Sequence, residues 1–278
     1  MHTATLATTS LLDHLRALAD CPRADGYACI QARHEHGVRS VAIDRPTLAI
    51  VLSGKKQLRR AGGVDVRLDE GDLFIVTRAL HLDVTNSPNP ESGLYRTLTV
   101  PFCDEVMDAA RLLWAAPVVQ GGDDIVAMQA SRLESELLAW RQALAAERYG
   151  EARLALASVL VKLCSWGHPG VLVPSPPSVA AQVRAIVAQQ PAHRWQSRDF
   201  EAELGISGAT LRRRLSAEQT SLSETVTDAR LACAIQLLYT TRWPVKTVAA
   251  RVGYRSASSF VRRFVERYGM EPGAIGNA

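Results

Sequence analysis

The sequence has no long apolar run, because no stretch approaches the ~20 consecutive apolar residues that a membrane-spanning helix needs. Residues 1–20 also have no basic segment leading into an apolar core, so no secretory signal is expected. These absences predict a cytoplasmic protein without a membrane partner.

Cysteine pairs of the C-x-x-C type are also missing. The chain has an odd number of cysteines, which are Cys21, Cys29, Cys103, Cys164 and Cys233. This pattern fits a reducing compartment and argues against a disulfide framework or a structural zinc site. Cys21 and Cys29 have no basic neighbours that would activate a thiol. Because the sequence shows no nucleophile–base pair or phosphate-binding loop either, we expect no catalytic residues and no enzyme.

The charge of the chain is unevenly distributed. The net charge is +4, yet residues 178–278 alone contain 14 Lys/Arg against 8 Asp/Glu. The stretch 167-GHPGVLVPSPP-177 has the composition of a linker. We therefore expect a domain at 1–166, a linker at 167–177 and a basic domain at 178–278. A polyanion is the natural partner of the basic domain, although a solvated basic surface would give the same count.

The N-terminal half changes its pattern near residue 103. Between about 25 and 102, short apolar runs such as TLAIVLSG alternate with turns, which predicts an antiparallel barrel or sandwich. From about 104 to 166 the pattern is helical, with one helix over 123–147 and another over roughly 150–166. Helices this apolar either cover the β-structure or pair with a second copy of the chain. The expected fold class is therefore α+β.

The C-terminal half contains the sequence pattern of a helix-turn-helix unit twice. In 197–219, Gly205 suits the turn and Ser207 can cap the second helix. In 245–269, Gly253 and Ser256 have the same positions, and Phe260 and Phe264 are expected inside. Ser178 can cap an earlier helix, and residues 223–241 can form one connecting helix of about five turns.

Each second helix leaves a face free for DNA, because its apolar residues are used for the core. A major groove admits one α-helix, and arginine can donate two hydrogen bonds to guanine. The residues expected to face bases are Ala209, Arg212, Arg213, Ala257, Ser258 and Arg262. Those expected to contact phosphates are Arg214, Arg255, Arg263 and Arg267.

Two longer motifs resemble the AraC/XylS family of bacterial transcription regulators. They are 230-RLACAIQLL-238, similar to the family's linker helix, and 248-VAARVGYRSASSFVRRFVERYGMEP-272, similar to its signature around the second unit. The resemblance implies two helix-turn-helix units that enter successive major-groove segments of promoter DNA. It also implies a transcription regulator, more often an activator than a repressor, that contacts RNA polymerase.

The first helix-turn-helix unit departs from the family pattern. Glu201 stands where the family usually has a small alanine between the helices. Either Glu201 turns to solvent through a shifted first helix, or this unit sits differently. The tail after Pro272 also lacks the aromatic-arginine ending common in the family.

The N-terminal half resembles the cupin-like barrel of such regulators, in the runs 46–58 and 69–84 with Gly71-Asp72 at a turn. That resemblance implies a sensing domain and a homodimer. His34 and His36 form an H-x-H pair like the first cupin motif, but no glutamate follows at the expected distance. His81 stands where regulatory cupins often have no ligand. Since a metal site needs three or four converging ligands, we expect no metal and no cofactor.

Three readings of the N-terminal half remain open. Its barrel cavity could bind a small-molecule effector, which a deep cavity lined by apolar and a few polar groups would favour. It could instead recognise a partner protein or act through oligomerisation, which an exposed apolar patch would favour. The third reading is a metal-binding cupin enzyme with a DNA-binding appendage, which three histidines on one metal would favour.

Overall fold

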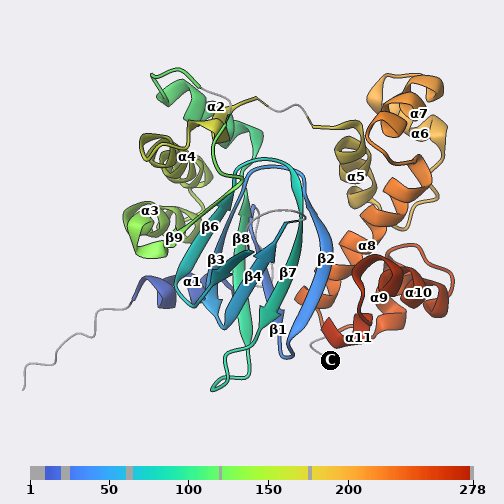
Figure 1. The fold of residues 1–278 in the computed structure, drawn as a ribbon, viewed down its shortest axis with the longest axis horizontal. Helices are drawn as coiled ribbons and strands as arrows, with labels where there is room; N and C mark the ends of the chain where they lie inside the picture. Colours follow the sequence, from blue (N-terminus) through green and yellow to red (C-terminus); the bar gives the residue numbers. More distant parts are fainter. Residues whose placement is uncertain (1–9, 20–25, 61–64, 119–120, 175–176, 276–278) are drawn as a thin grey trace, which may run out of the picture.

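The fold is α+β, as the sequence predicts: β-sheets with flanking helices, followed by a group of helices after the linker (Figure 1). The computed structural model describes residues 10–19, 26–60, 65–118, 121–174 and 177–275. Cys21 lies outside these residues. We call the residues before and after the predicted linker the N-terminal part and the C-terminal part. Within the described ranges, no helix is long and apolar enough to cross a bilayer.

The strands of the N-terminal part form two antiparallel sheets. The five-stranded sheet has the order β1-β8-β3-β6-β9, and the four-stranded sheet has the order β2-β7-β4-β5. The strands are β1 (Ala28–Ala32), β2 (His36–Ile43), β3 (Thr47–Ser53), β4 (Lys55–Arg59), β5 (Asp65–Leu68), β6 (Asp72–Val76), β7 (Leu80–Ser87), β8 (Tyr95–Pro101) and β9 (Ile125–Gln129).

The five-stranded sheet is buried on both faces, which explains the continuous apolar run of β3. Leu48, Ile50 and Leu52 lie in a core shared with the helices on the outer face. Ala49 and Val51 alternate with them and lie in a second core, together with residues of the four-stranded sheet. Because successive side chains of a strand point to opposite faces, a strand covered on both sides has to be apolar throughout.

Helices cover the outer face of the five-stranded sheet (Figure 1). They are α1 (Leu11–Ala19), α2 (Asp104–Leu113), α3 (Glu134–Ala145) and α4 (Tyr149–Ser165), with short 3₁₀ turns η1 (Ala130–Leu133) and η2 (Pro169–Leu172). The predicted helix over roughly 150–166 agrees with α4. The predicted helix over 123–147 is wrong in its first part, because residues 125–129 form β9. This segment pairs with β6 in the order Leu73–Met128 and Ile75–Val126, and such long-range pairing overrides a local helical pattern.

The C-terminal part is helical, as predicted. Its helices are α5 (Val179–Gln189), α6 (Ser197–Leu204), α7 (Gly208–Ala217), α8 (Leu222–Thr240), α9 (Val245–Arg251), α10 (Ala257–Tyr268) and α11 (Pro272–Ile275). The Oγ of Ser178 accepts a hydrogen bond from the backbone N–H of Ala181 at 3.1 Å, so Ser178 caps α5 as the sequence suggests. The connecting helix predicted over 223–241 agrees with α8.

The C-terminal part packs directly against the sheets. Helix α8 contacts β1 and helix α10 contacts β2, and both strands are edge strands (Figure 1). One hydrophobic core contains Ala32 of β1, Val38 of β2, Leu238 of α8 and Phe264 of α10. The two parts of the chain are therefore joined by a common core as well as by a linker.

Candidate nucleic-acid interface

Helices α6 and α7 form the first helix-turn-helix unit, with the turn that the sequence predicts. Gly205 ends α6 in the left-handed conformation, at φ 63°, where glycine carries no steric penalty. The Oγ of Ser207 accepts a hydrogen bond from the backbone N–H of Thr210 at 3.3 Å and caps α7. Leu211 and Leu215 are buried and hold α7 against the rest of the C-terminal part.

Glu201 lies between α6 and α7 instead of turning to solvent. The hydroxyl of Ser197 donates a hydrogen bond to its Oε1 at 2.9 Å. A Cβ atom on Gly208 would lie 2.5 Å from the same Oε1. Since Gly208 opens α7, the small residue that the family resemblance places in α6 is here supplied by α7. This exchange makes room for the carboxylate without separating the helices.

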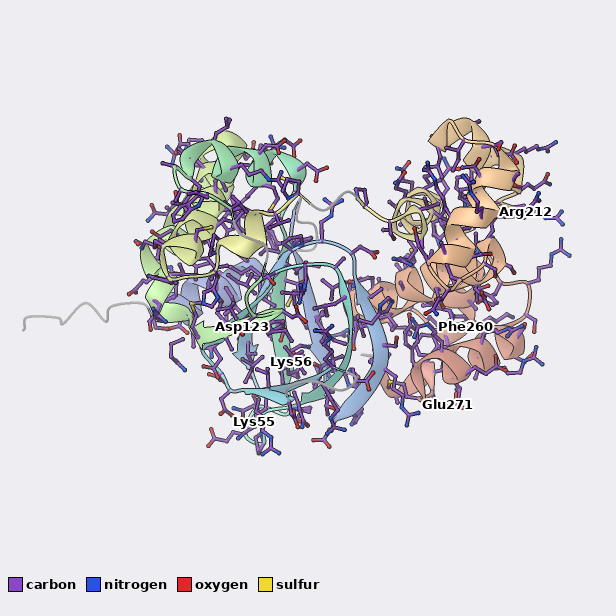
Figure 2. The ribbon with its side chains drawn as sticks, turned by 45° about the horizontal axis from the view of Figure 1, so that its top comes forward. Lys55, Lys56, Asp123, Arg212, Phe260 and Glu271 are labelled. Carbon is purple, nitrogen blue, oxygen red and sulfur yellow. The ribbon has the colours of Figure 1, made fainter. Side chains whose placement is uncertain are left out.

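The outward face of α7 is basic and exposed. Arg212, Arg213 and Arg214 are all exposed, and so is Ala209 in the first turn. In Figure 2 the side chain of Arg212 extends away from the sheets. The first turn of α7 thus presents small side chains followed by three adjacent arginines, which is the arrangement that the sequence predicts for a DNA-facing helix.

Helices α9 and α10 form the second unit. Gly253 has φ 87° in the turn, and Ser256 caps α10 by accepting a hydrogen bond from the N–H of Ser259 at 3.3 Å. Phe260 and Phe264 are completely buried, with ring centroids 5.4 Å apart. The predicted roles of all four residues are confirmed.

Arg230 of α8 anchors this second unit, a role that the sequence did not reveal. Its Nε donates to the carbonyl of Pro191 at 2.9 Å, and its Nη2 donates to the carbonyl of His193 at 2.7 Å. A Cβ atom on Gly253 would lie 3.0 Å from both Ala192 Cα and the Pro191 oxygen. The turn of the second unit therefore packs closely against the loop after α5, and Arg230 fixes that loop.

The outward face of α10 carries the other predicted DNA contacts. Ser258 and Arg255 are exposed, and Ala257 is half-buried. The side chain of Arg262 is 68% exposed and lies 3.9 Å from a Glu266 oxygen. Arg263 pairs with the same carboxylate at 3.0 Å. A weak pair on an exposed helix surface contributes little energy, so both guanidinium groups can exchange Glu266 for another anion.

Arg267 differs from the other predicted phosphate contacts because it faces the N-terminal part. Its side chain is only 22% exposed and pairs with Asp228 of α8 at 2.9 Å. Its Nη2 also donates to the carbonyl of Ser40 in β2 at 2.9 Å. Ser40 has a positive φ of 50° at an irregularity in β2. In this structure Arg267 joins α10 to β2, and the arrangement gives no support to its predicted contact with phosphate.

A row of buried polar side chains crosses the four-stranded sheet and ends on α8. The strand register places His36, Asn86 and Lys56 side by side on β2, β7 and β4. Lys56 Nζ donates to Asn86 Oδ1 at 2.8 Å and to the hydroxyl of Tyr95 at 3.3 Å. All four side chains are buried.

Tyr239 of α8 completes this row. His36 Nδ1 lies 3.0 Å from the carbonyl of His34, which can only accept, so Nδ1 is the donor. His36 Nε2 then accepts from the Tyr239 hydroxyl at 2.7 Å. Burial lowers the pKa of His36, consistent with a neutral ring, and burial lowers the pKa of Lys56 to about 7. The hydrogen bonds connect the space between the sheets with the helix that joins the two helix-turn-helix units.

The histidines weighed as metal ligands are arranged differently from a cupin metal site. Both ring nitrogens of His36 are used by protein partners, whereas His34 and His81 are exposed. Among the residues that the structure describes, no group of three or more His, Cys, Asp or Glu could hold a metal ion.

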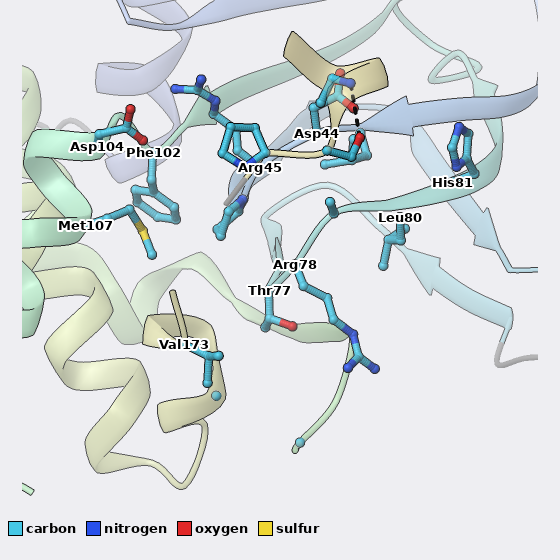
Figure 3. Close-up of a pocket in the computed structure, with 18 of the residues that line it drawn as sticks. Asp44, Arg45, Thr77, Arg78, Leu80, His81, Phe102, Asp104, Met107 and Val173 are labelled. Atoms are coloured by element: carbon cyan, nitrogen blue, oxygen red, sulfur yellow. Dashed lines mark hydrogen bonds between the residues drawn. The ribbon is translucent and has the colours of Figure 1, made fainter. Parts of the chain in front are cut away.

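The space between the sheets is filled by side chains. Val51, Leu58, Phe74 and Leu82 are buried there with Tyr95. A pocket of about 430 Å³ lies elsewhere, where the β2–β3 turn, the β6–β7 turn and α2 meet the start of α5 (Figure 3). This pocket thus lies at the rim of the β-structure and is lined by both charged and apolar residues.

Comparisons with known proteins agree with this geometry. Residues 201–278 match a protein family described as "Helix-turn-helix domain". The chain is 33% identical over 96 residues to the HTH-type transcriptional regulator GadX of Escherichia coli (strain K12), covering 34% of this chain and 35% of GadX. It is 37% identical over 95 residues to the HTH-type transcriptional regulator YdeO of the same strain, covering 34% of this chain and 37% of YdeO. The matches span about a third of the length of these curated relatives.

The fold of the whole chain is similar to that of ToxT from Vibrio cholerae. An apo form of ToxT matches with a TM-score of 0.64 at 13% identity, covering 90% of this chain and 97% of ToxT. ToxT has also been solved with an unsaturated fatty acid bound. At this identity the likeness concerns the fold alone. The relatives that share sequence with the chain are transcription regulators and not enzymes. With its two helix-turn-helix units joined by α8, the C-terminal part carries a helix-turn-helix domain of the AraC type, matched over residues 201–278.

Proposed function

We propose that the protein is a sequence-specific DNA-binding transcription regulator. The observation that carries this proposal is the pair of capped helices, α7 and α10. Each buries its large apolar side chains and presents small residues and arginines on its outward face. The two helices belong to units joined by one continuous helix of 19 residues. A pair of such units suits two major-groove segments on one side of a duplex.

Within this proposal the arginines have different roles. Ala209, Arg212, Arg213, Ala257, Ser258 and Arg262 face bases. Arg214, Arg255 and Arg263 contact phosphates, which position the protein without selecting sequence. Arg267 is left out of this set because it is held by Asp228 and Ser40.

Replacement of Arg262 by alanine tests the role in reading bases. If Arg262 forms a bidentate pair with a guanine, specific binding weakens by about 1–3 kcal/mol, whereas binding to random DNA changes less. Arg263→Ala should instead weaken both by similar amounts and reduce the salt dependence. Arg67→Ala is the matched control, because Arg67 is exposed on β5 in the other part of the chain. The operator is found first by selection from random duplexes and binding is measured by fluorescence anisotropy. An equal loss on operator and random DNA for Arg262→Ala would contradict the assignment.

We also propose that a small-molecule effector controls the N-terminal part. The fold similarity to ToxT, which has been solved with an unsaturated fatty acid bound, supports this view. The hydrogen bonds from Lys56 through Asn86 and His36 to Tyr239 give a physical connection to α8. An effector acts only if its affinity differs between two arrangements of the chain. A ligand screen read out as thermal stabilisation tests this, since a ligand that binds the folded state raises its melting temperature.

A homodimer is the third element of the proposal. Helices α2 and α4 pack together and carry large exposed apolar side chains, with Leu112 88% exposed and Leu154 and Tyr149 also exposed. Such side chains gain free energy when a second copy covers them. Sedimentation velocity tests this: Leu112→Lys with Leu154→Lys should shift the protein towards monomer and leave its fold intact. A monomeric wild-type chain would contradict the homodimer.

The division into residues 1–166, a linker at 167–177 and residues 178–278 is part of the same proposal. Activation of transcription, contact with RNA polymerase and a cytoplasmic location stay predictions. An in vitro transcription assay with purified polymerase distinguishes activation from repression.

A further inference from the structure

The pocket of about 430 Å³ has walls from both parts of the chain. The N-terminal part supplies the β2–β3 turn with Asp44 and Arg45, the β6–β7 turn with Arg78, and Arg111 of α2. The C-terminal part supplies the first turns of α5, including Arg184. Figure 3 shows side chains of the two turns and of α2 around the pocket. The volume suits a small organic molecule.

Arginine dominates the charge of this pocket. Arg45, Arg78, Arg111 and Arg184 line it, and the carboxylates among its lining residues are those of Asp44 and Asp104. Their partners only partly neutralise these arginines. Arg78 shares the carboxylate of Asp124 with Arg60, so two cations lie on one anion. Arg111 is held by Asp108 at 2.7 Å and by the carbonyl of Leu172 at 3.0 Å.

His81 also lines the pocket, and its pKa is affected by the charges around it. Burial lowers its pKa most, and the charges of Arg184 and Arg267 lower it further against the smaller opposing effects of Asp44 and Asp228. Among these four charges, the two arginines therefore outweigh the two aspartates in their effect on the ring.

One ion pair connects the two walls. The Nε of Arg184 donates to Asp44 Oδ2 at 3.0 Å, and Nη2 donates to Asp44 Oδ1 at 2.5 Å. This bidentate pair joins α5 to the β2–β3 turn. A carboxylate or phosphate group on a ligand also offers two oxygens that can accept both N–H groups of this guanidinium.

We propose that this pocket binds a small molecule carrying two oxyanion groups, carboxylates or phosphates, which lie between Arg78 of the N-terminal part and Arg184 of the C-terminal part. The inference deepens the proposed effector control and rests on it. Because the two walls belong to different parts of the chain, the ligand gains its full contacts only while these parts stay docked. Its binding therefore stabilises the docked arrangement, and Asp44 competes with it for Arg184.

The test uses the full chain with two probes, sodium succinate for the carboxylates and sodium pyrophosphate for the phosphates. Thermal unfolding is followed against probe concentration, with sodium chloride of equal ionic strength as the reference. We expect saturable stabilisation by one of the probes, and the probe that acts identifies the ligand chemistry. Arg184→Gln and Arg78→Gln should raise the apparent Kd at least about tenfold, since each removes a charge-assisted pair. Arg198→Gln, an exposed change elsewhere in the C-terminal part, should leave it unchanged.

Asp44→Asn separates ligand binding from a loss of the ion pair. Both Arg184→Gln and Asp44→Asn break the connection between α5 and the β2–β3 turn. The common core of β1, β2, α8 and α10 keeps the two parts docked in both variants. Only Arg184→Gln removes a ligand contact, so Asp44→Asn should bind the probe as tightly as the wild type or more tightly. Equal weakening in both variants, equal Kd values in all variants, or no saturable stabilisation by either probe would overturn the proposal.

DNA binding of the same proteins distinguishes this inference from the proposed function. Without probe, Arg184→Gln should bind the selected operator like the wild type, because Arg184 lies outside α7 and α10. Loss of probe binding with intact operator binding therefore concerns the pocket alone. If the wild-type chain selects no operator but the probe results are as expected, the regulator function fails and the pocket stands.

Discussion

Replacement of Lys56 by methionine should remove the rise of stability with pH between pH 7.5 and 9. Lys56 is 6% exposed, and burial lowers its pKa from 10.5 to about 7. The folded state therefore holds the Lys56 proton less tightly than the unfolded state. The unfolded state binds more protons between pH 7 and 10.5, so stability rises with pH in this window and the contribution is lost as pH falls towards 7.

The magnitude follows from the two pKa values. Each unit of pKa difference corresponds to 1.36 kcal/mol, so the whole shift corresponds to about 5 kcal/mol. Only part of it lies in an accessible pH range. Between pH 7.5 and 9 the wild-type protein should gain about 2 kcal/mol from Lys56 alone. The range ends at pH 9 because burial raises the pKa of Cys164, Cys233, Tyr95 and Tyr239, which act in the opposite direction at higher pH.

Urea denaturation at several pH values measures this slope. Lys56→Met also deprives Asn86 and Tyr95 of a donor, but that loss does not depend on pH, so the slope is the diagnostic quantity. Lys55→Met is the control, because Lys55 is the adjacent residue of β4 and is 70% exposed. It should keep the wild-type slope. Parallel slopes for wild type and Lys56→Met would refute the reasoning.

Three further predictions concern the C-terminal part and can be measured by the same urea method. Gly253→Ala should destabilise more than Gly205→Ala: both have positive φ, but only at Gly253 would the new Cβ meet backbone atoms at 3.0 Å, and equal losses would contradict this packing. Phe260→Ala should cost about 3–5 kcal/mol, because the ring is completely buried, and a loss below 1 kcal/mol would mean that the site is not closely packed. Tyr239→Phe should cost about 1–3 kcal/mol, since His36 and Asn86 lose a buried partner. An unchanged stability would show that water replaces the hydroxyl.

Features that depend on neighbouring residues could be predicted from the sequence. Ser178, Ser207 and Ser256 cap helices because a hydroxyl reaches an N–H group three residues away. The positive φ of Gly205 and Gly253 follows from the same local logic. The double helix-turn-helix arrangement and its exposed arginines are therefore readable from residues close together in the chain.

Features that depend on residues far apart in the chain could not be predicted from the sequence. The segment 125–129 has apolar residues at a spacing that suits a helix, and only the free edge of β6 makes it a strand. His36 and Tyr239 are separated by more than two hundred residues, and no local pattern pairs them. Arg267 and Ser40 are also far apart in the sequence. The local pattern therefore predicts a DNA contact for Arg267, as for the neighbouring arginines.

The packing of side chains between the two sheets could not be predicted from the sequence pattern either. The alternation of apolar residues predicts which side chains face inward, but whether they leave a cavity depends on how sizes on both sheets combine. Here Phe74 and Tyr95 occupy the space, and the pocket lies at the rim, where turns far apart in sequence meet.

The common core of α8, α10 and the edge strands β1 and β2 has a consequence for how such a protein can be recombined. If the C-terminal part were grafted onto a foreign N-terminal part, Leu238 and Tyr239 would lose the surface that buries them. A chimera would then expose apolar groups and an unpaired hydroxyl unless the new strands offered matching side chains. The contact residues of β1, β2 and α8 should therefore be transferred together. Junctions for engineered fusions are better placed after Ile275 than within the linker.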